Sequence, residues 1–488
     1  MDLGALVEDS GRVSSAWGKI EITGLTADSR EVAPGNLFAA IAGGRADGAR
    51  FIPDACRRGA AAVLVGPQVS GAATLGVPVI RVNNPRRALA LAAARFYGRQ
   101  PEIVAAVTGT NGKTSVAAFL RQIWRHAGHA AASIGTVGVV VDGALRALQH
   151  TTPDPVALHR LLRDLADEGV THAAMEASSH GLAQYRIDGV RFSAAGFTNV
   201  SRDHLDYHES FEDYLAQKLR LFTVLLASDG TAVVNADSHH AKTVIEAVRA
   251  RGLGCLTVGE RGEALKLAAH ARVVLGQTLA VVDADGGKHE VTLPLVGDFQ
   301  AANALVAAGL AIATGVPAGE ALAALSTLEG AKGRLEKVGE TGEGAAIFVD
   351  YAHTPDALKT VLETLRPYTR RRLIVVFGAG GDRDKGKRPQ MGKIAAELAD
   401  IAIVTDDNPR GEDAAAIRAD ILATAPEAIE IGDRRTAVAA GVRMLRAGDV
   451  LLVAGKGHEA GQIVGDEVIP FSDHDAVMVA LEQVGARG

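Results

Sequence analysis

The sequence predicts an α/β protein of several domains built mainly on parallel sheets. Short apolar segments alternate with amphipathic helical stretches through most of the chain, which is typical of βαβ units. The chain has 488 residues. Because that exceeds what one hydrophobic core usually supports, about two to four domains are expected.

Three blocks can be separated, at residues 1–98, 99–332 and 333–488. Apolar segments bounded by turn or helix signals predict the strands within them. These are residues 61–65 and 79–82 in the first block; 103–107, 173–175, 194–197 and 232–234 in the second; and 345–349, 373–377, 401–404 and 450–453 in the third.

The composition excludes several classes of protein. The net charge of −6 argues against a nucleic-acid partner, because proteins that bind polyanions normally carry a basic excess. Cys56 and Cys255 lie far apart, which argues against a disulfide framework or a zinc site and favours a reducing compartment. The first residues lack the features of a signal peptide, and the apolar runs are too short to cross a bilayer. A cytoplasmic protein without membrane insertion is therefore expected.

A glycine-rich segment, TGTNGKTS at residues 108–115, follows the predicted strand 103–107 and precedes an amphipathic stretch at 116–126. Such a turn before a helix binds phosphate through backbone N–H groups and the positive end of the helix. Lys113 would bridge phosphate oxygens, and the Thr114 hydroxyl would ligate Mg²⁺. The general phosphate-loop motif requires glycine where this chain has Val107, so an ordinary surface turn remains an alternative on local pattern alone.

Three further features lie near this segment in the predicted sheet. Glu176 follows the predicted strand 173–175, where a carboxylate could hold Mg²⁺, although a helix-capping role is the alternative. The polar segment SRDHLDYH at 201–208 follows another apolar strand, and one of its histidines could ligate a metal. Lys218 lies on a predicted helix, residues 211–226, where a solvated lysine is the ordinary expectation.

Taken together, these motifs resemble the Mur ligase family. TGTNGKTS is similar to the ATP loop of Mur ligases and of the related folylpolyglutamate synthases. MEASSHGL at 175–182, SRDHLDYH at 201–208 and Lys218 recur together in Mur ligases. The resemblance spans the chain with every motif in family order, and Ser115, where many relatives have threonine, is its one departure at a catalytic position. It implies an N-terminal UDP-binding domain, a central P-loop-type parallel-sheet ATPase domain and a C-terminal Rossmann-like domain that binds the amino acid.

The resemblance also implies the reaction. ATP would activate a carboxylate as an acyl phosphate, which an amine then attacks, releasing ADP and phosphate. The substrates would be UDP-N-acetylmuramoyl-L-alanyl-D-glutamate and meso-diaminopimelate, in peptidoglycan precursor synthesis. ATP and Mg²⁺ are the expected cofactors, the expected partners are small molecules only, and a monomer is expected.

Site residues follow from the family motifs. The resemblance assigns catalysis to Lys113, Glu176, His204 and Lys218, and the metal to Thr114, Glu176, His204 and a carbamylated Lys218. Because CO₂ adds only to a neutral amine, the pKa of Lys218 must be depressed.

ATP would contact Gly109, Thr110, Asn111, Gly112, Lys113, Thr114, Ser115, Asn303, Arg334 and Asp350. Asp350 follows a predicted strand, so its side chain is expected in an open cleft, accepting from ribose hydroxyls. The UDP-muramoyl peptide would contact Ser29, Gly44, Arg45, Ala46, Thr151, Thr152, Ser178, Gln184 and Arg186.

The amino-acid pocket is expected where three polar loops, at residues 378–385, 406–410 and 455–459, follow predicted strands. By the resemblance, the sequence DNPR at 407–410 is the family's meso-diaminopimelate signature, and lysine-adding relatives lack its arginine. Arg410 and Asn408 would hold the distal carboxylate, and Glu459 and the Gly455 carbonyl the distal amine. The full set is Arg383, Asp407, Asn408, Pro409, Arg410, Gly455 and Glu459.

Two other functions remain open at this point. A folylpolyglutamate synthase-like ligase shares the phosphate loop, although the first block and the sequence at 407–410 argue against it. A P-loop nucleotide switch that performs no ligation would hydrolyse a nucleotide without needing an amino acid.

Overall fold

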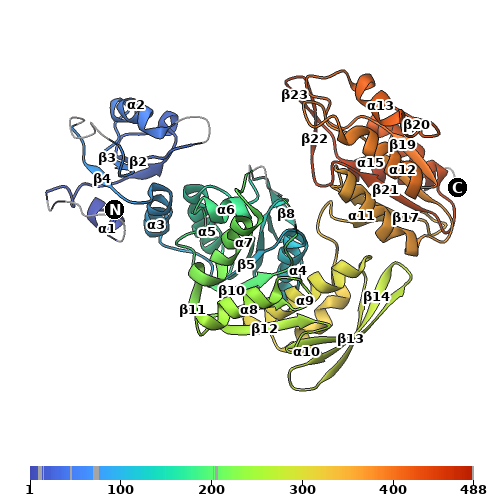
Figure 1. The fold of residues 1–488 in the computed structure, drawn as a ribbon, viewed down its shortest axis with the longest axis horizontal. Helices are drawn as coiled ribbons and strands as arrows, with labels where there is room; N and C mark the ends of the chain where they lie inside the picture. The colour runs from blue at the N-terminus through green and yellow to red at the C-terminus, as the bar shows by residue number, and fades with distance from the viewer. Residues whose placement is uncertain are drawn as a thin grey trace. The chain divides into compact units, whose positions relative to one another are not determined.

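The computed structural model describes residues 1–8, 14, 16–43, 47–69, 76–148, 150–201, 203 and 207–485. The chain forms two compact units (Figure 1). The first comprises Met1–Leu267, Val282–Lys288 and Leu305–Ala324, and the second comprises Ala268–Val281, His289–Ala304 and Leu325–Gly488. Both contain parallel β-sheets covered by helices, so the predicted α/β class is confirmed.

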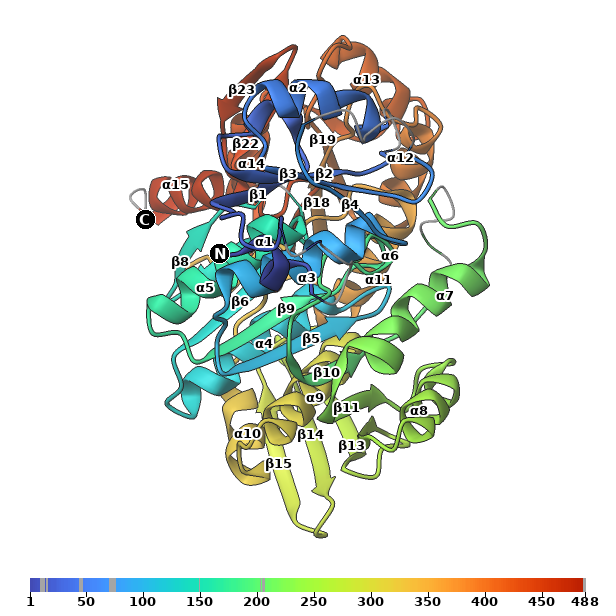
Figure 2. The same cartoon turned by 90° about the vertical axis from the view of Figure 1, so that its left-hand side faces the viewer.

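The N-terminal part of the first unit is a parallel sheet with strand order β1-β2-β3-β4. Helix α2 covers one face of this sheet, and α1 and α3 cover the other (Figure 2). The elements are β1 Gly24–Thr26, β2 Asn36–Ala40, β3 Ala62–Val65, β4 Val79–Arg81, α1 Leu3–Leu6, α2 Ile52–Arg57 and α3 Pro85–Tyr97.

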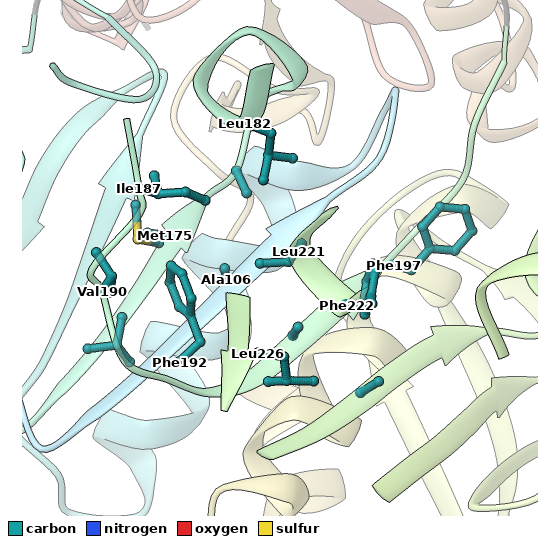
Figure 3. Close-up of a cluster of buried hydrophobic side chains, with 14 of the residues drawn as sticks. Ala106, Met175, Leu182, Ile187, Val190, Phe192, Phe197, Leu221, Phe222 and Leu226 are labelled. Atoms are coloured by element: carbon teal, nitrogen blue, oxygen red, sulfur yellow. The ribbon is translucent and has the colours of Figure 1, made fainter. Parts of the chain in front are cut away.

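The first unit also contains a larger sheet with strand order β12-β11-β10-β5-β9-β6-β7-β8, parallel from β12 to β6. Its strands are β5 Ile103–Thr108, β6 Ala131–Gly135, β7 Gly138–Val141, β8 Ala144–Arg146, β9 His172–Glu176, β10 Phe192–Phe197, β11 Leu226–Asn235 and β12 Gly254–Gly259. Its helices are α4 Lys113–His126, α5 Pro155–Asp167, α6 Ser179–Ala183, α7 Phe211–Arg220 and α8 Ala241–Ala250. Figure 3 shows part of its core, which includes Met175, Phe192 and Leu221.

The next five strands and α-helices after β12 complete this part of the chain. They are β13 Leu265–Val273, β14 Gly276–Asp283, β15 Lys288–Leu293, α9 Asp298–Ala313 and α10 Ala318–Ala324. None of the helices in the described ranges combines the length and apolar character needed to cross a membrane.

The predicted helix over residues 211–226 is shorter in the structure. Helix α7 ends at Arg220, a π-helical turn occupies Leu221–Leu225, and β11 begins at Leu226. The Arg251 guanidinium donates to the carbonyls of Phe222 at 2.8 Å and Leu226 at 3.0 Å. The Leu226 N–H donates to the Leu221 carbonyl, five residues back, which is the bonding pattern of a π-helix.

Helix α4 begins differently from α3 and α5. Asn84 and Asp154 accept backbone N–H bonds at the starts of α3 and α5, each followed by proline. Helix α4 instead starts at Gly112 with no side-chain cap. Its first N–H groups therefore remain available to an anionic ligand.

The second unit contains a sheet with strand order β16-β17-β21-β18-β19-β20, parallel except for β16. Helices α11, α12 and α13 pack on one face, and α14 and α15 on the other. The strands are β16 Glu336–Glu340, β17 Ala346–Asp350, β18 Leu373–Phe377, β19 Ile401–Val404, β20 Ile429–Glu430 and β21 Val450–Ala454, with a separate hairpin of β22 Gly461–Val464 and β23 Glu467–Pro470. The helices are α11 Pro355–Leu365, α12 Lys387–Leu398, α13 Ala414–Leu422, α14 Arg434–Met444 and α15 Asp473–Gly485.

A buried ion pair joins three elements of this unit. Arg434 on α14 donates from Nε and Nη2 to the Asp473 carboxylate of α15, each at 2.8 Å. Nη2 also donates to the Ala454 carbonyl at the end of β21, at 3.0 Å. Both charged side chains are fully buried, so removal of either leaves an uncompensated charge in the core.

We predict that Asp473→Ala lowers the free energy of unfolding of the second unit by about 3–5 kcal/mol. Urea denaturation, followed by a probe in this unit, measures the change. Glu363→Ala is the matched control, because Glu363 pairs with Lys359 on the exposed surface of α11 at 3.9 Å, and its loss should cost at most about 0.5 kcal/mol. Equal effects of the two substitutions would contradict the prediction.

Candidate active site

The glycine-rich loop joins β5 to α4 at the carboxyl edge of the larger sheet of the first unit. Gly112 has φ +86°, a conformation that favours glycine. A Cβ added at Gly109 would lie 2.0 Å from Thr198 Oγ1, so this position also requires glycine. Lys113 Nζ donates to the carbonyls of Gly109 at 2.9 Å and Thr110 at 2.8 Å. The ammonium thus lies over the loop, as binding of phosphate oxygens requires.

Residues immediately after β10 hold this loop in shape. Asn199 accepts from Thr110 N through its carbonyl at 2.8 Å and from Asn111 N through Oδ1 at 3.1 Å. Thr198 Oγ1 donates to the Asn111 carbonyl at 2.6 Å. Thr198 and Asn199 were not among the predicted site residues. Their only signal is that they are polar and follow a buried strand.

Glu176 ends β9 with its side chain buried beside the glycine-rich loop. Thr114 Oγ1 donates to Glu176 Oε2 at 3.1 Å, and Thr136 N donates to Oε1 at 2.7 Å. The structure therefore brings together two residues predicted to bind the metal, and a hydroxyl beside a carboxylate suits Mg²⁺. Clusters of three or more His, Cys, Asp or Glu side chains suited to a metal are absent from the described residues. The third predicted ligand, His204, lies outside those residues.

Lys218, the fourth predicted ligand, is buried on α7. Its Nζ donates to the Gly109 carbonyl at 2.8 Å and lies 4.4 Å from the centre of the Tyr214 ring. Burial, and to a lesser extent the positive charge of Lys113, lower the pKa of Lys218 to about 6. The amine is therefore mostly neutral near pH 7, which is the state that can take up CO₂.

Hydroxyl groups connect Glu176 to residues predicted to bind the muramoyl peptide. Thr152 Oγ1 donates to the Glu176 carbonyl at 3.0 Å and lies 2.9 Å from Ser178 Oγ. Thr136 Oγ1 lies 3.0 Å from Thr151 Oγ1. These side chains form one continuous polar surface next to the metal-binding candidates.

Arg186 extends this surface toward the N-terminal sheet. Its guanidinium donates to the Thr152 carbonyl at 2.8 Å and to Gln184 Oε1 at 2.8 and 3.1 Å. Burial lowers the pKa of Arg186, so an anionic ligand would stabilise its charge. Arg186, Gln184, Ser29 and Arg86 are among the residues that line a cavity of about 990 Å³. The other residues predicted for this ligand, Gly44, Arg45 and Ala46, lie outside the described residues.

In the second unit, the three predicted polar loops lie together because β21, β18 and β19 are neighbours in the sheet. Gly381 N donates to the Asn408 carbonyl at 2.9 Å, which joins the loops after β18 and β19. A Cβ added at Gly455 would lie 2.7 Å from Asp407 Oδ2, so the loop after β21 is equally close. Arg383 is exposed and donates to the carbonyl of its neighbour Asp382 at 3.2 Å.

A buried lysine organises these loops and was not among the predicted residues. Lys456 Nζ donates to Asn408 Oδ1 at 2.9 Å and to Glu459 Oε2 at 3.0 Å. Asn408 Nδ2 donates to the same Glu459 oxygen at 3.0 Å. Asn408 is thus held by protein groups, and Lys456 partly neutralises Glu459. The only feature of the sequence that pointed to Lys456 was its position in the glycine-containing segment GKGHE.

Two side chains in this region can still form hydrogen bonds to a ligand. Asp407 Oδ2 is buried and has no hydrogen-bond partner among the described residues, so it can accept from an ammonium. Arg410 donates from Nη1 to the Gly381 carbonyl at 2.9 Å. Its other guanidinium nitrogens remain suited to a carboxylate.

The expectation that the Asp350 side chain is exposed is wrong. Its carboxylate is buried and accepts from Leu335 N at 2.6 Å and Ala352 N at 2.7 Å, and burial raises its pKa. Asp350 ends β17 as predicted, but it folds back to hold two turns.

The other two residues predicted to contact ATP from the second unit lie in different surroundings. Asn303 is buried and donates to Gln300 Oε1 at 3.1 Å. Arg334 lies over the Tyr351 ring, with its guanidinium carbon 5.0 Å from the ring centre. The buried Arg334 Nε has no partner in the described part of the chain.

Three family models match the chain in succession. The Mur ligase family catalytic domain matches residues 21–97, the Mur ligase middle domain residues 107–311, and the Mur ligase glutamate ligase domain residues 333–457. The three-domain architecture expected from the sequence is confirmed.

Individual proteins give the same result. The UDP-N-acetylmuramoyl-L-alanyl-D-glutamate--2,6-diaminopimelate ligase of Mesorhizobium japonicum is 57% identical over 99% of both chains. A solved structure of a UDP-N-acetylmuramoyl-L-alanyl-D-glutamate--2,6-diaminopimelate ligase has 32% identity and a TM-score of 0.75, with 99% of both chains covered.

The folylpolyglutamate synthase of Mycobacterium tuberculosis, solved with ADP and AMPPCP, shares the fold. It has a TM-score of 0.59 at 19% identity, and the match covers 83% of this chain and 95% of that one. The successive domain matches, together with 57% identity over nearly the full length of a named ligase, establish that this chain belongs to the Mur ligase family.

Proposed function

We propose that this enzyme joins meso-diaminopimelate to UDP-N-acetylmuramoyl-L-alanyl-D-glutamate at the expense of ATP, in peptidoglycan precursor synthesis. The near full-length relative named for this reaction supports the proposal. The observation that carries it is the loop at residues 407–410, which presents Arg410 where three strand ends meet. We also propose that residues 1–98 form the domain that binds UDP, residues 99–332 the domain that binds ATP, and residues 333–488 the domain that binds the amino acid.

The first step is phosphoryl transfer. The γ-carboxylate of the D-glutamyl residue attacks the γ-phosphorus of ATP, ADP leaves, and an acyl phosphate forms. Lys113 and the uncapped start of α4 stabilise the negative charge of the phosphates. Thr114 and Glu176 would hold Mg²⁺, which would supply further charge neutralisation. The second step is attack of the diaminopimelate amine on the acyl carbon, which forms the amide and releases phosphate and a proton.

Selection of the amino acid depends on the second unit. Meso-diaminopimelate differs from lysine by a carboxylate on its distal carbon. Arg410 pairs with this carboxylate, and Asp407 and Glu459 accept hydrogen bonds from the distal ammonium. Lysine leaves Arg410 without its anion, which disfavours lysine strongly.

Because ATP and a nucleotide-linked precursor are the substrates, we also propose a cytoplasmic location and small molecules as the only partners. A monomeric state stays a prediction.

One assay separates this proposal from its alternatives. Phosphate release is measured with ATP and the UDP-muramoyl dipeptide, adding meso-diaminopimelate, L-lysine or no amine. We predict release that depends on diaminopimelate and exceeds release with lysine by at least about 100-fold. Release that ignores the amine would favour the nucleotide switch. Activity only on a folate substrate with glutamate would favour the folylpolyglutamate synthase.

Lys218 provides a second test. We predict that Lys218→Ala lowers kcat by at least about 100-fold, because the carbamate that would bind Mg²⁺ is lost. Formate or acetate should restore part of the activity by supplying a free carboxylate. Lys359→Ala, which removes an exposed lysine of α11, is the control and should keep full activity. Full activity of Lys218→Ala without added acid would rule out a role for the carbamate.

The pH dependence of this carbamate can be measured without activity. Because the pKa of Lys218 is lowered to about 6, the amine loses its proton as the pH rises through that value. The ¹³C signal of a carbamate formed from labelled bicarbonate should therefore grow from about pH 5 to about pH 8. The signal should be absent from Lys218→Arg. A carbamate signal that strengthens as the pH falls would contradict the assignment.

A further inference from the structure

The hairpin at residues 461–470 is an unusual part of the second unit. It forms a two-stranded sheet of its own, β22 paired with β23, outside the main sheet. Its β23 strand is exposed along its whole length, with Val468 67% accessible. The two core clusters of the main sheet include no residue of this hairpin among those described. The hairpin therefore contributes little to the core, and an isolated hairpin of this size is only marginally stable.

The hairpin is attached almost entirely to the loop predicted to select the amino acid. In the described part of the chain, four hydrogen bonds join residues 461–470 to other segments, and all four end on residues 407–410. Arg410 N donates to the Ile463 carbonyl at 3.0 Å, and Gly465 N donates to the Arg410 carbonyl at 2.7 Å. Ile463 N donates to Asn408 Oδ1 at 3.0 Å. The fourth bond comes from Gln462, whose Nε2 donates to the Asp407 carbonyl at 2.7 Å.

Arg410 requires such support. Its φ is +52°, the left-handed region, which costs an arginine roughly 1–2 kcal/mol and persists only where the surroundings impose it. The hairpin holds both the N–H and the carbonyl of this residue. Pro409 before it has a fixed φ, and Asn408 is confined to extended conformations because proline follows. The direction of the Arg410 side chain is therefore set by rigid neighbours on one side and the hairpin on the other.

Of the four hydrogen bonds described for this contact, the one from Gln462 is the one made by a side chain of the hairpin. It holds the carbonyl of Asp407, the residue whose carboxylate has a buried oxygen without a hydrogen-bond partner in the described chain. Loss of this bond frees the start of the 407–410 loop and leaves the three backbone contacts of the hairpin to hold the rest. Gln462 does not reach the substrate atoms itself. Its effect passes through Asp407, Asn408 and Arg410.

We propose that Gln462 is a positioning residue for amino-acid selection, and that the hairpin at residues 461–470 fixes the direction of Arg410. This inference rests on the proposed function, since it assumes that the 407–410 loop binds diaminopimelate. It assigns a role to a segment that the fold does not need for its core.

The test compares Gln462→Met, which keeps the length of the side chain but removes the donor, with the wild-type enzyme. We expect KM for meso-diaminopimelate to rise about five- to thirtyfold, the range for one lost hydrogen bond to a polar group. The KM values for ATP and the UDP-muramoyl dipeptide should stay within about twofold, and kcat within about threefold. Preference for diaminopimelate over L-lysine should fall, because Arg410 is held less firmly. Gln462→Glu should raise KM further, since its carboxylate faces a carbonyl oxygen.

Gln390→Met is the matched control. Gln390 is an exposed glutamine of α12 whose Nε2 also donates to a backbone carbonyl, that of Gly386, at 3.1 Å. Its loss should leave all three KM values unchanged. Thermal unfolding of each variant is recorded, and hydrogen exchange of the Arg410 amide provides a readout that is independent of activity. Exchange at this amide should be faster in Gln462→Met and unchanged in Gln390→Met.

The outcomes are distinct. A wild-type enzyme that releases no phosphate in response to diaminopimelate overturns the proposed function itself. Wild-type activity together with an unchanged diaminopimelate KM in Gln462→Met overturns the inference alone. A parallel rise of all three KM values, with a lower unfolding temperature, shows a general structural role and also overturns it.

Discussion

Parallel strands that end at the same edge of a sheet are the constraint on which both candidate sites depend. In the first unit, β5, β9 and β10 are neighbours, so the glycine loop, Glu176 and the residues after β10 meet at one edge. In the second unit, the adjacency of β18, β19 and β21 brings together loops that are far apart in the sequence. The same geometry thus produces the candidate phosphate site in one unit and the proposed amino-acid pocket in the other.

Each candidate site contains a buried lysine, and the two lysines have different surroundings. Lys218 is held in the core against a carbonyl, an aromatic ring and the field of a second lysine, so its pKa falls and its amine becomes available for CO₂. Lys456 is equally buried, but it faces the carboxylate of Glu459 and the oxygen of Asn408. We propose modification for the first lysine, and the second holds the loops of the proposed amino-acid pocket together.

The sequence predicted the strands and the loops that follow them because apolar segments and glycine turns are local patterns. β18 and β19 were predicted with their observed bounds, and Thr114 and Glu176 were correctly expected to meet. The direction of the Asp350 side chain was wrong, because two N–H groups of neighbouring turns draw its carboxylate inward. The end of α7 was also misplaced, because the chain widens into a π-helical turn at Leu221–Leu225 before β11 begins. Lys456 and Gln462 were missed because Asn408 lies 48 residues from Lys456 and Asp407 lies 55 residues from Gln462, separations that no local pattern reveals.

The central claim is that the carboxylate of the D-glutamyl residue is activated by direct phosphorylation at the glycine loop. The most direct measurement uses UDP-muramoyl dipeptide labelled with ¹⁸O in that γ-carboxylate and follows the released phosphate by ³¹P NMR. Attack of the carboxylate on ATP, followed by amide formation, must leave one carboxylate oxygen in the phosphate, so one ¹⁸O per phosphate is expected. Unlabelled phosphate, released together with the amide product, would contradict the mechanism.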